Sequence, residues 1–230
     1  MKAMILAAGH GTRMRPLTDH TPKPLLEVAG KPLIVWHLEK LKQAGFSDIV
    51  INIAWLGEQI PAALGDGSTF GVSIQYSDEQ HEGALETAGG IIKALDLFDE
   101  QPFLVISGDI WCDYDLSTPV SFNEKSLAHL ILVKNPAHHP EGDFACIDGQ
   151  LNQYEHPKYT FSGIGYYQPE LFIPMREKIR KGELSKQQPI GKLLRATMDK
   201  GLVSGEYFTG DWRDIGTPER LLKLDRDLRV

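Results

Sequence analysis

Short strand-like runs alternate with amphipathic stretches along the first half of the chain. Four runs have the length and composition of strands: Ala3–Ala7, Ile49–Ile53, Val72–Tyr76 and Phe103–Ser107. Three stretches between them carry apolar residues at helical spacing: Pro32–Ala44, Leu56–Leu64 and Thr87–Leu97. Pro32 suits the first turn of a helix, and Gly45 suits its end. Strands and helices in this alternating order predict parallel strand pairing with helices covering the sheet.

The pattern changes in the second half, where strand candidates follow one another between turn-rich loops. These candidates are Leu127–Val133, Ala145–Ile147, Leu151–Tyr154, Phe161–Tyr167 and Leu202–Phe208, and helical patterns occur at Ile190–Met198 and Pro218–Leu228. We expect one α/β domain over residues 1–230, with a Rossmann-like, mixed and mainly parallel sheet flanked by helices. Residues 1–120 would form a nucleotide-binding half, and residues 121–230 would complete the sheet and add a small substrate lobe.

The overall charge is negative, yet positive charges gather near the N-terminus. The 230 residues carry a formal net charge of −7, which argues against a nucleic-acid-binding surface. The opening segment differs, because its cations outnumber its carboxylates: Lys2, Arg13, Arg15 and Lys23 against Asp19. This local surplus is compatible with a small anionic substrate.

Neither the cysteines nor the apolar runs indicate an oxidising or a membrane environment. Cys112 and Cys146 stand in unrelated contexts, so they predict neither a disulfide framework nor a four-ligand zinc site. The apolar run Ala3–Ala8 is short for the core of a signal peptide, and no run approaches membrane-spanning length. We therefore expect a cytoplasmic protein with no membrane partner.

The segment after the first strand has the composition of a phosphate-binding loop. Gly9 and Gly11 would let backbone N–H groups approach a phosphate at the carboxyl end of the strand. Thr12 adds a hydroxyl donor, and Arg13 can place two donors on phosphate oxygens. Lys23 lies between two prolines that restrict its backbone. The stretch as a whole predicts polyphosphate binding.

Two common phosphate motifs do not fit this segment. The dinucleotide fingerprint G-x-G-x-x-G requires glycine where the chain has Met14. The Walker motif requires Gly-Lys followed by Ser or Thr, whereas Gly30-Lys31 and Gly191-Lys192 are followed by Pro and Leu. A dehydrogenase and a P-loop NTPase are both disfavoured.

The opening stretch instead resembles the sugar-1-phosphate nucleotidylyltransferase family. The family pattern L-A-A-G-x-G-T-R-x-x-P-L-T, followed by P-K-P-L, stands here as LAAGHGTRMRPLT (Leu6–Thr18) and PKPL (Pro22–Leu25). The resemblance extends over essentially the whole chain. It implies the nucleotide-diphospho-sugar transferase type of fold and transfer of a nucleotidyl group from an NTP to a sugar 1-phosphate, with release of pyrophosphate.

Two carboxylates are candidates for a Mg²⁺ site. Asp109 ends a predicted strand opposite the glycine loop, where it can hold the metal against phosphates. Asp214 lies in a W-x-D-x-G-T-P string that resembles the family's second metal-binding motif, and Asp211 is the weaker choice. Asp113 and Asp115 are interpreted as solvated turn residues. Thr217, before Pro218, is the expected N-cap of the last helix.

The resemblance assigns further roles around the nucleotide. Arg13 would stabilise the pyrophosphate leaving group, and Lys23 would hold the α-phosphate and the incoming nucleophile. The segment SDEQHEGALETAGGI resembles the part of the family that reads the base. The nucleotide-binding set is then Ala8, Gly9, Gly11, Thr12, Arg13, Lys23, Gln80, Ala84 and Leu85. Glu86 stands where many relatives have glycine, and it is equally interpreted as a helix N-terminal charge.

The second half would supply the sugar-phosphate site. The family's E-K-P triplet stands here as Glu155-His156-Pro157, so Glu155 keeps the carboxylate for sugar hydroxyls and the lysine is missing. His156, or Lys192 from another loop, would replace that charge. If His156 does so, activity should fall as the imidazole loses its proton. Asp143 and Gly163 are further candidates by position.

The details of the motifs favour one substrate pair within the family. The strings HGTRMRPLT, GALETAGGI, PEGDF and FSGIGYY look closest to the branch that uses UTP and N-acetylmuramic acid 1-phosphate in cell-wall (peptidoglycan) sugar recycling. Glucose, N-acetylglucosamine or mannose 1-phosphate stay open as alternatives. So does phosphocholine with CTP, for which an aromatic cage would draw on Trp111, Tyr154 and Trp212. A non-catalytic nucleotide-sugar sensor is disfavoured, and we expect a monomer.

Overall fold

The computed structural model describes residues 1–118, 120 and 125–229, and the chain divides into two compact units. The first unit contains Met1–Ala84, Ile106–Thr118 and Asp211–Val230, and the second contains Leu85–Val105 and Pro119–Gly210. The predicted boundary between residues 120 and 121 borders residues outside the described ranges. The units are interleaved in sequence, because the C-terminal residues belong to the first unit and residues 85–105 to the second.

The first unit is built on a parallel three-stranded arrangement in the order β5, β4, β1. Strand β1 (Lys2–Leu6) pairs with β4 (Asp48–Ile53), which pairs in turn with β5 (Ser73–Asp78). Helix α1 (Leu33–Gln43) turns a buried face of leucine and isoleucine side chains inward, and α2 (Gln59–Leu64) follows β4. The predicted alternation of strands and helices is confirmed here, and the parallel pairing places the ends of β1, β4 and β5 at one edge.

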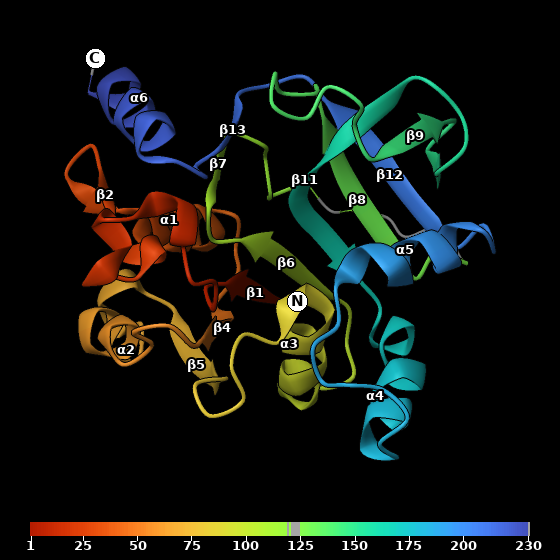
Figure 1. Ribbon diagram of the computed structural model, residues 1–230, viewed down its shortest axis with the longest axis horizontal. Helices are drawn as coiled ribbons and strands as arrows, with labels where there is room; N and C mark the ends of the chain where they lie inside the picture. The colour runs from red at the N-terminus through yellow and green to blue at the C-terminus, as the bar shows by residue number, and fades with distance from the viewer. Residues whose placement is uncertain (119, 121–124, 230) are drawn as a thin grey trace. The chain divides into compact units, whose positions relative to one another are not determined.

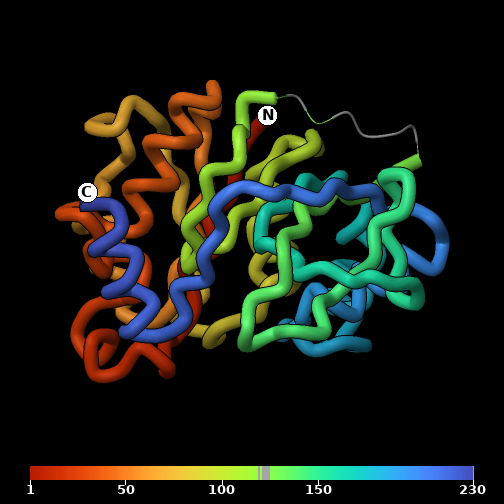
Figure 2. Tube along the Cα trace, turned by 90° about the horizontal axis from the view of Figure 1, so that it is seen from above, coloured from red at the N-terminus to blue at the C-terminus, as the bar shows by residue number. Residues whose placement is uncertain are grey.

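The C-terminal segment returns to this first unit. Strand β13 (Trp212–Asp214) pairs antiparallel with β7 (Ile110–Cys112), and Figure 1 shows it leading into helix α6 (Pro218–Leu228). Thr217 caps α6 as predicted, since its hydroxyl accepts a hydrogen bond from the backbone N–H of Arg220. Helix α6 lies beside β2 (Glu27–Val28), and Figure 2 shows the blue C-terminal coil against red and orange N-terminal chain. The N–H of Ala29 donates to Asp225 Oδ1 at 2.8 Å.

Short elements complete the first unit. They are the 3₁₀ turns η1 (Thr12–Met14), η2 (Leu17–Asp19), η3 (Lys23–Leu25) and η4 (Ser68–Phe70), and strand β3 (Lys31–Pro32), which pairs with β2. A buried cluster joins the glycine loop to the C-terminal helix: Met14, Leu26, Val28, Leu33, Ile215, Leu221 and Leu224. This packing holds the segment after β1 against the segment after β13.

The second unit contains a mixed sheet in which the strands β8 to β12 form a closed ring of pairings. Strand β8 (Ala128–Val133) pairs parallel with β12 (Val203–Phe208) and antiparallel with β11 (Lys158–Tyr167). Strand β10 (Gln150–Asn152) pairs with β12 and with β9 (Phe144–Ile147), and β9 also pairs with β11. The strands predicted in the second half are thus confirmed, and so is the mixed α/β class.

The helices of the second unit include one that the hydrophobic pattern missed. Helix α3 (Glu86–Ala94) ends in the 3₁₀ turn η5 (Leu95–Phe98), and α5 (Ile190–Met198) packs on β10 and β12. Helix α4 (Ile173–Arg180), after η6 (Pro169–Leu171), has no buried residue, and half of its residues are charged, so its sequence carries only a weak helical signal. Strand β6 (Phe103–Ser107) runs from this unit into the first.

Within the described residues, no helix combines the length and the apolar character needed to cross a bilayer.

Candidate active site

Contacts with neighbouring residues fix the conformation of the glycine loop after β1. Gly11 has φ 61°, a left-handed conformation in which glycine is favoured. A methyl group on Gly11 would lie 2.9 Å from Cγ2 of Thr18 and 3.4 Å from Cβ of Lys23. The Thr18 hydroxyl donates to the Gly11 carbonyl at 2.8 Å, and Trp55 Nε1 donates to the Thr18 carbonyl at 3.0 Å. The loop therefore has no room for a side chain at position 11.

A buried polar pair fixes the start of this loop. The side-chain oxygen of Asn52, in β4, accepts a hydrogen bond from the N–H of Ala7 at 2.8 Å. The amide nitrogen of Asn52 donates to Glu79 Oε1 at 2.7 Å, and both side chains are buried. Ala8, of the predicted nucleotide set, is buried in the next position. Sequence reasoning missed Asn52 and Glu79, although a polar residue inside the apolar run IVINI was a usable signal.

The first cation and the first carboxylate of the predicted site lie in direct contact. Lys23 Nζ is 2.7 Å from Asp109 Oδ2. The Lys23 side chain is 10% exposed and that of Asp109 is 43% exposed, so the lysine rises from a buried stem to a more open carboxylate. The structure thus brings the segment of η3 together with the turn between β6 and β7.

The second carboxylate lies on a backbone segment adjacent to the first. In the β7–β13 ladder Asp214 is opposite Ile110, and the N–H of Ile215 donates to the carbonyl of Asp109 at 2.9 Å. Asp109 and Asp214 are thus one position apart in register on neighbouring segments. The sequence predicts that these two residues, about a hundred positions apart in the chain, act together. The β7–β13 ladder brings their backbones together.

Asp214 is paired with Arg220, a residue that sequence reasoning missed. The Arg220 guanidinium contacts Oδ2 of Asp214, and its Nη1 lies 3.4 Å from the Asp214 carbonyl. Arg220 is on the first turn of α6, where its N–H donates a hydrogen bond to the hydroxyl of the N-cap residue Thr217. The G-T-P-E-R string gave a signal only for the helix start, since nothing in it specified a partner for the arginine.

Gly216 is the point at which three charged side chains converge. A methyl group on Gly216 would lie 2.9 Å from Asp214 Oδ1, 2.9 Å from Arg220 Nη2 and 3.3 Å from Arg13 Nη1. Arg13, predicted to bind the pyrophosphate, therefore flanks the same point as the second metal-binding candidate. A side chain at this position would displace the charged ends of Asp214 and Arg220, so glycine leaves them in place.

Asp211 and Asp115, near β7 and β13, have partners of their own. The Asp211 carboxylate accepts hydrogen bonds from Nε and Nη2 of Arg213, with Nη2 at 2.7 Å from Oδ2. Asp115 accepts hydrogen bonds from the N–H and the hydroxyl of Ser117. The interpretation of Asp115 as a turn residue agrees with these contacts, and Asp211 is occupied by an arginine outside the predicted site.

A buried histidine lies beneath the Asp109 turn. His37, on α1, is 7% exposed, and burial lowers its pKa from 6.5 to about 4, with the charge of Lys40 acting in the same direction. The charge of Asp109 and a hydrogen bond to the backbone of Ile110 oppose this shift without cancelling it. His37 is therefore neutral at pH 7, and it supports the Asp109–Ile110 backbone as an uncharged donor.

The donor set suits a magnesium ion that is shared with substrate phosphates. Among the described residues, no three His, Cys, Asp or Glu side chains gather as a protein metal centre would require. Mg²⁺ is commonly bound through one or two carboxylates together with phosphate oxygens, so Asp109 and Asp214 on adjacent segments fit that requirement. Both carboxylates are neutralised by cations of the chain, Lys23 and Arg220.

The base-reading candidates are divided along the chain between the two units. In the first unit, the N–H of Gln80 donates to Asp78 Oδ1 at 2.8 Å, and Ala84 is the last residue before the boundary. In the second unit, Leu85 is buried at the start of α3. Glu86 has φ 63°, which glycine adopts at lower cost. This backbone conformation explains why glycine suits this position in the family's base-reading segment. The contacts with the base stay a prediction.

The sugar-site candidates of the second unit include an anchored aspartate. Asp143 Oδ2 accepts the N–H of Phe161 at 2.8 Å, and Asp143 Oδ1 lies 3.2 Å from His139 Nε2. Gly163, with φ 85°, lies where the β11–β8 register shifts between Phe161 and Gly165. Asp143 therefore holds the strand just before an irregularity in the strand pairing.

The remaining sugar-site candidates are exposed. The N–H of Glu155 donates to Asn152 Oδ1 at 2.8 Å, which orders the loop that carries Glu155 and His156. Glu155, His156 and Lys192 are exposed, so their side chains are accessible to a ligand. Their roles toward a sugar phosphate stay predictions.

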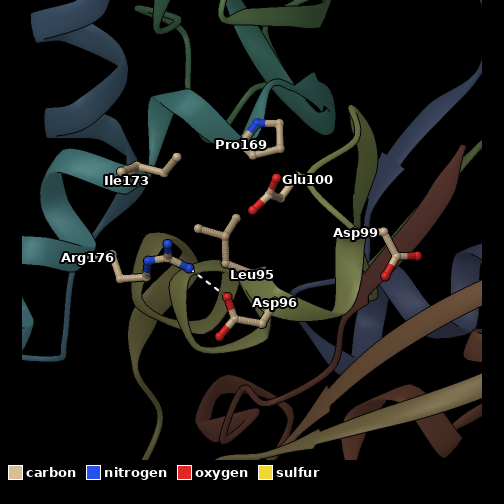
Figure 3. Close-up of a pocket in the computed structure, with 7 residues that line it drawn as sticks. All are labelled: Leu95, Asp96, Asp99, Glu100, Pro169, Ile173 and Arg176. Atoms are coloured by element: carbon tan, nitrogen blue, oxygen red, sulfur yellow. Dashed lines mark hydrogen bonds and ion pairs between the residues drawn. The ribbon is translucent and has the colours of Figure 1, made fainter.

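A separate hollow in the second unit contains none of the predicted site residues. It is lined by Leu95, Asp96, Asp99, Glu100, Pro169, Ile173 and Arg176. Figure 3 shows Arg176 turned toward Asp96, with Nη1 2.7 Å from Oδ1, while Asp99 points away from this pair. The ion pair joins η5 to α4 across the hollow, so its two charged lining residues have a structural role.

Comparison with known sequences gives a match over nearly the whole chain. The Nucleotidyl transferase family matches residues 2–229. N-acetylmuramate alpha-1-phosphate uridylyltransferase from Neisseria meningitidis serogroup B is 54% identical over 228 residues, which cover 96% of this chain and 95% of the relative. UTP–glucose-1-phosphate uridylyltransferase from Synechocystis is 32% identical over 94% of this chain. The chain spans 60% of that longer relative.

Solved structures give the same result for the fold. A Bacillus anthracis protein, named as a candidate glucose-1-phosphate thymidylyltransferase and solved with sucrose, matches with a TM-score of 0.81 and 28% identity over 100% of this chain and 95% of its own. CTP:phosphocholine cytidylyltransferase from Streptococcus pneumoniae matches with a TM-score of 0.75 and 23% identity over 99% of this chain and 98% of its own. The second likeness bears on the fold alone.

Proposed function

The chain belongs to the Nucleotidyl transferase family, and on that premise we propose that it transfers the uridylyl group of UTP to N-acetylmuramic acid α-1-phosphate. The products are UDP-N-acetylmuramic acid and pyrophosphate. The observation that carries this choice is the 54% identity to the meningococcal uridylyltransferase over 96% of the chain. Such a reaction supplies a cell-wall precursor, and we place it in the cytoplasm, where the free thiols Cys112 and Cys146 would stay reduced.

The proposed reaction is an in-line displacement at the α-phosphorus of UTP. A phosphate oxygen of the sugar 1-phosphate forms the new P–O bond, and the bond to the β-phosphate oxygen breaks as pyrophosphate leaves. A phosphate monoester with a second pKa of about 6 is largely dianionic at pH 7, so the nucleophile needs no general base. The protein has to position two anions and neutralise their charge.

The cations of the first unit are suited to that task. Lys23 would move from Asp109 onto the α-phosphate and the incoming oxygen. Its side chain is 10% exposed, so the ammonium group would be delivered from a mostly buried side chain on a fixed segment. Arg13, beside Gly216, would bind the leaving pyrophosphate with two parallel donors. The N–H groups around Gly9, Gly11 and Thr12 would cradle the remaining phosphate oxygens.

Asp109 and Asp214 are the residues that would hold Mg²⁺. When bound, the ion neutralises phosphate charge and stabilises the charge that develops on the leaving group. The contribution of the chain is to hold two hard oxygen donors on adjacent segments, and the hydrogen bond from the Ile215 N–H to the Asp109 carbonyl joins the backbones that carry them.

In the second unit we propose a binding site for the sugar phosphate. Asp143 and the bulge at Gly163 would present acceptors and backbone groups to the sugar, and Glu155 would accept from its hydroxyls. His156, or Lys192, would supply the positive charge that the E-K-P lysine has in relatives. All three side chains Glu155, His156 and Lys192 are exposed, which is compatible with ligand binding.

A substrate panel tests the proposed function directly. Pyrophosphate release should be measured with Mg²⁺ for UTP, CTP, GTP and dTTP, each with N-acetylmuramic acid, N-acetylglucosamine, glucose or mannose 1-phosphate. Phosphocholine with CTP is a further arm. We expect the highest kcat/KM for UTP with N-acetylmuramic acid 1-phosphate. Preference for another pair would reject the substrate assignment, and absence of pyrophosphate release in every arm would reject the transferase.

A further inference from the structure

We propose that Arg220 is a second pyrophosphate-binding cation, which Asp214 holds in place until Mg²⁺ and the nucleotide arrive. The inference rests on the proposed function and adds to it a binding residue that lies outside both predicted nucleotide-binding motifs, the glycine loop and P-K-P-L. It concerns an exchange of partners: Asp214 passes from Arg220 to the metal, and Arg220 passes from Asp214 to the phosphates.

The position of Arg220 is the first argument. Its guanidinium contacts the Asp214 carboxylate, and its Nη2 lies within 2.9 Å of the point at which a Gly216 methyl group would stand. Nη1 of Arg13 lies 3.3 Å from the same point. Two guanidinium groups from distant segments, η1 and α6, therefore lie beside the same backbone position, Gly216, in the first unit. Paired guanidinium groups are favoured donors for phosphate oxygens.

The symmetry with the first carboxylate is the second argument. Lys23 is paired with Asp109 as Arg220 is paired with Asp214, so each candidate metal ligand already carries a cation. The three cations Arg13, Lys23 and Arg220 exceed the two carboxylates by one charge. Adding Mg²⁺ with a triphosphate of four negative charges changes the sum from +1 to −1, so the bound anion is nearly balanced.

Solvent access to the pair is the third argument. The Arg220 side chain is 27% exposed and that of Asp214 is 21% exposed, so the pair is neither sealed in the core nor fully solvated. The N–H of Arg220 is capped by Thr217 and keeps the backbone in place while the side chain changes partner. Partly exposed ion pairs contribute modestly to stability, so the pair can open at low cost.

The experiment compares the wild type with Arg220→Gln in two binding measurements. Binding of inorganic pyrophosphate at saturating Mg²⁺ is measured by calorimetry, and binding of Mn²⁺ alone is measured by electron paramagnetic resonance. We expect Arg220→Gln to weaken pyrophosphate binding about tenfold or more, the scale of a lost hydrogen bond to a charged group. We expect the same variant to bind Mn²⁺ about twofold to fivefold more tightly, because Asp214 loses its competing cation.

Opposite changes in the two affinities are the signature of partner exchange. If Mn²⁺ binding weakens, Arg220 only orients Asp214, and the inference is overturned. If pyrophosphate binding is unchanged, Arg220 does not reach the phosphates, and the inference is overturned as well. Arg220→Lys keeps the charge and should recover part of the pyrophosphate affinity.

Arg226→Gln is the matched control. Arg226 is on the same helix, is exposed, and loses the same charge when substituted, so both affinities should stay at the wild-type values. Thermal unfolding of all variants verifies that α6 stays folded. The two proposals fail separately: an inactive wild type rejects the proposed function, whereas an active wild type with unchanged pyrophosphate binding in Arg220→Gln rejects only the role of Arg220.

Discussion

Lys23 and Asp109 form an ion pair of 2.7 Å between Nζ and Oδ2, across a separation of 86 residues. The lysine belongs to a proline-bounded 3₁₀ turn and the aspartate to the turn between β6 and β7, so two turns meet at one charged contact. The pair explains how a lysine can be buried to 8% exposure without an uncompensated charge. It also makes the two residues the natural subjects of the first prediction.

Asp109→Asn and Lys23→Ala should each lower kcat by about 10²–10³, the scale measured for loss of one preorganised charge-stabilising group. Asp109→Asn removes a carboxylate that Mg²⁺ requires, and Lys23→Ala removes the cation proposed for the α-phosphate. Steady-state pyrophosphate release under saturating substrates is the measurement. Asp115→Asn, in an exposed turn nearby, is the control and should keep wild-type kcat. Near-normal turnover in either test variant contradicts the assigned roles.

Gly216→Ala should lower kcat/KM by about 10²-fold, because the added methyl group lies within 2.9 Å of both Asp214 Oδ1 and Arg220 Nη2. The displaced groups include those proposed to hold the metal and the pyrophosphate. Gly191→Ala is the matched control, since its methyl group would meet only Arg195 Nη1 at 3.5 Å. Equal activity of the two alanine variants would show that the convergence at Gly216 does not matter for turnover.

Glu86→Gly should raise the stability of the protein by about 1 kcal/mol, which is a Tm increase of a few degrees for a chain of this size. The reason is the φ of 63° at Glu86, which costs more for a residue with a Cβ atom than for glycine. Glu86→Ala removes the charge but keeps the Cβ atom, so it should give no such gain. A gain of equal size in both variants would assign the effect to the carboxylate rather than to the backbone.

The stability of the protein should depend on pH through His37. Its pKa is about 4 in the folded protein and 6.5 when unfolded, so the unfolded chain takes up the proton first as the pH falls. The stabilisation is complete above pH 6.5 and is lost progressively down to about pH 4, by about 3 kcal/mol. Urea unfolding at pH 7 and pH 4.5 measures this loss.

His37→Asn is the variant that isolates the contribution of His37. Asparagine keeps a side-chain donor for the backbone of Ile110 but does not titrate in this range. The loss of stability between pH 7 and pH 4.5 should be smaller in the variant by about the amount assigned to His37. An identical pH dependence in the two proteins would show that other groups cause the acid sensitivity.

Local sequence patterns were sufficient for most of the elements and for a prediction of the kind of site. The strand β4 and the helices α5 and α6 follow from apolar periodicity, and Thr217 follows from its position before a proline. The prediction of a phosphate-binding loop follows from glycines and cations in one continuous stretch. Each of these features depends on residues that are close in the chain, so the sequence specifies them directly.

The tertiary structure decided which distant residues meet. The ladder of β7 and β13 sets Asp109 beside the backbone of Ile215, and the packing of α6 brings Arg220 to Asp214. Asn52 reaches Ala7 only because β4 pairs with β1 in one register. No local pattern encodes these contacts, because they depend on where folded segments pack against one another. Sequence alone therefore determined the chemistry that the site contains, and tertiary packing determined which charge stands beside which carboxylate.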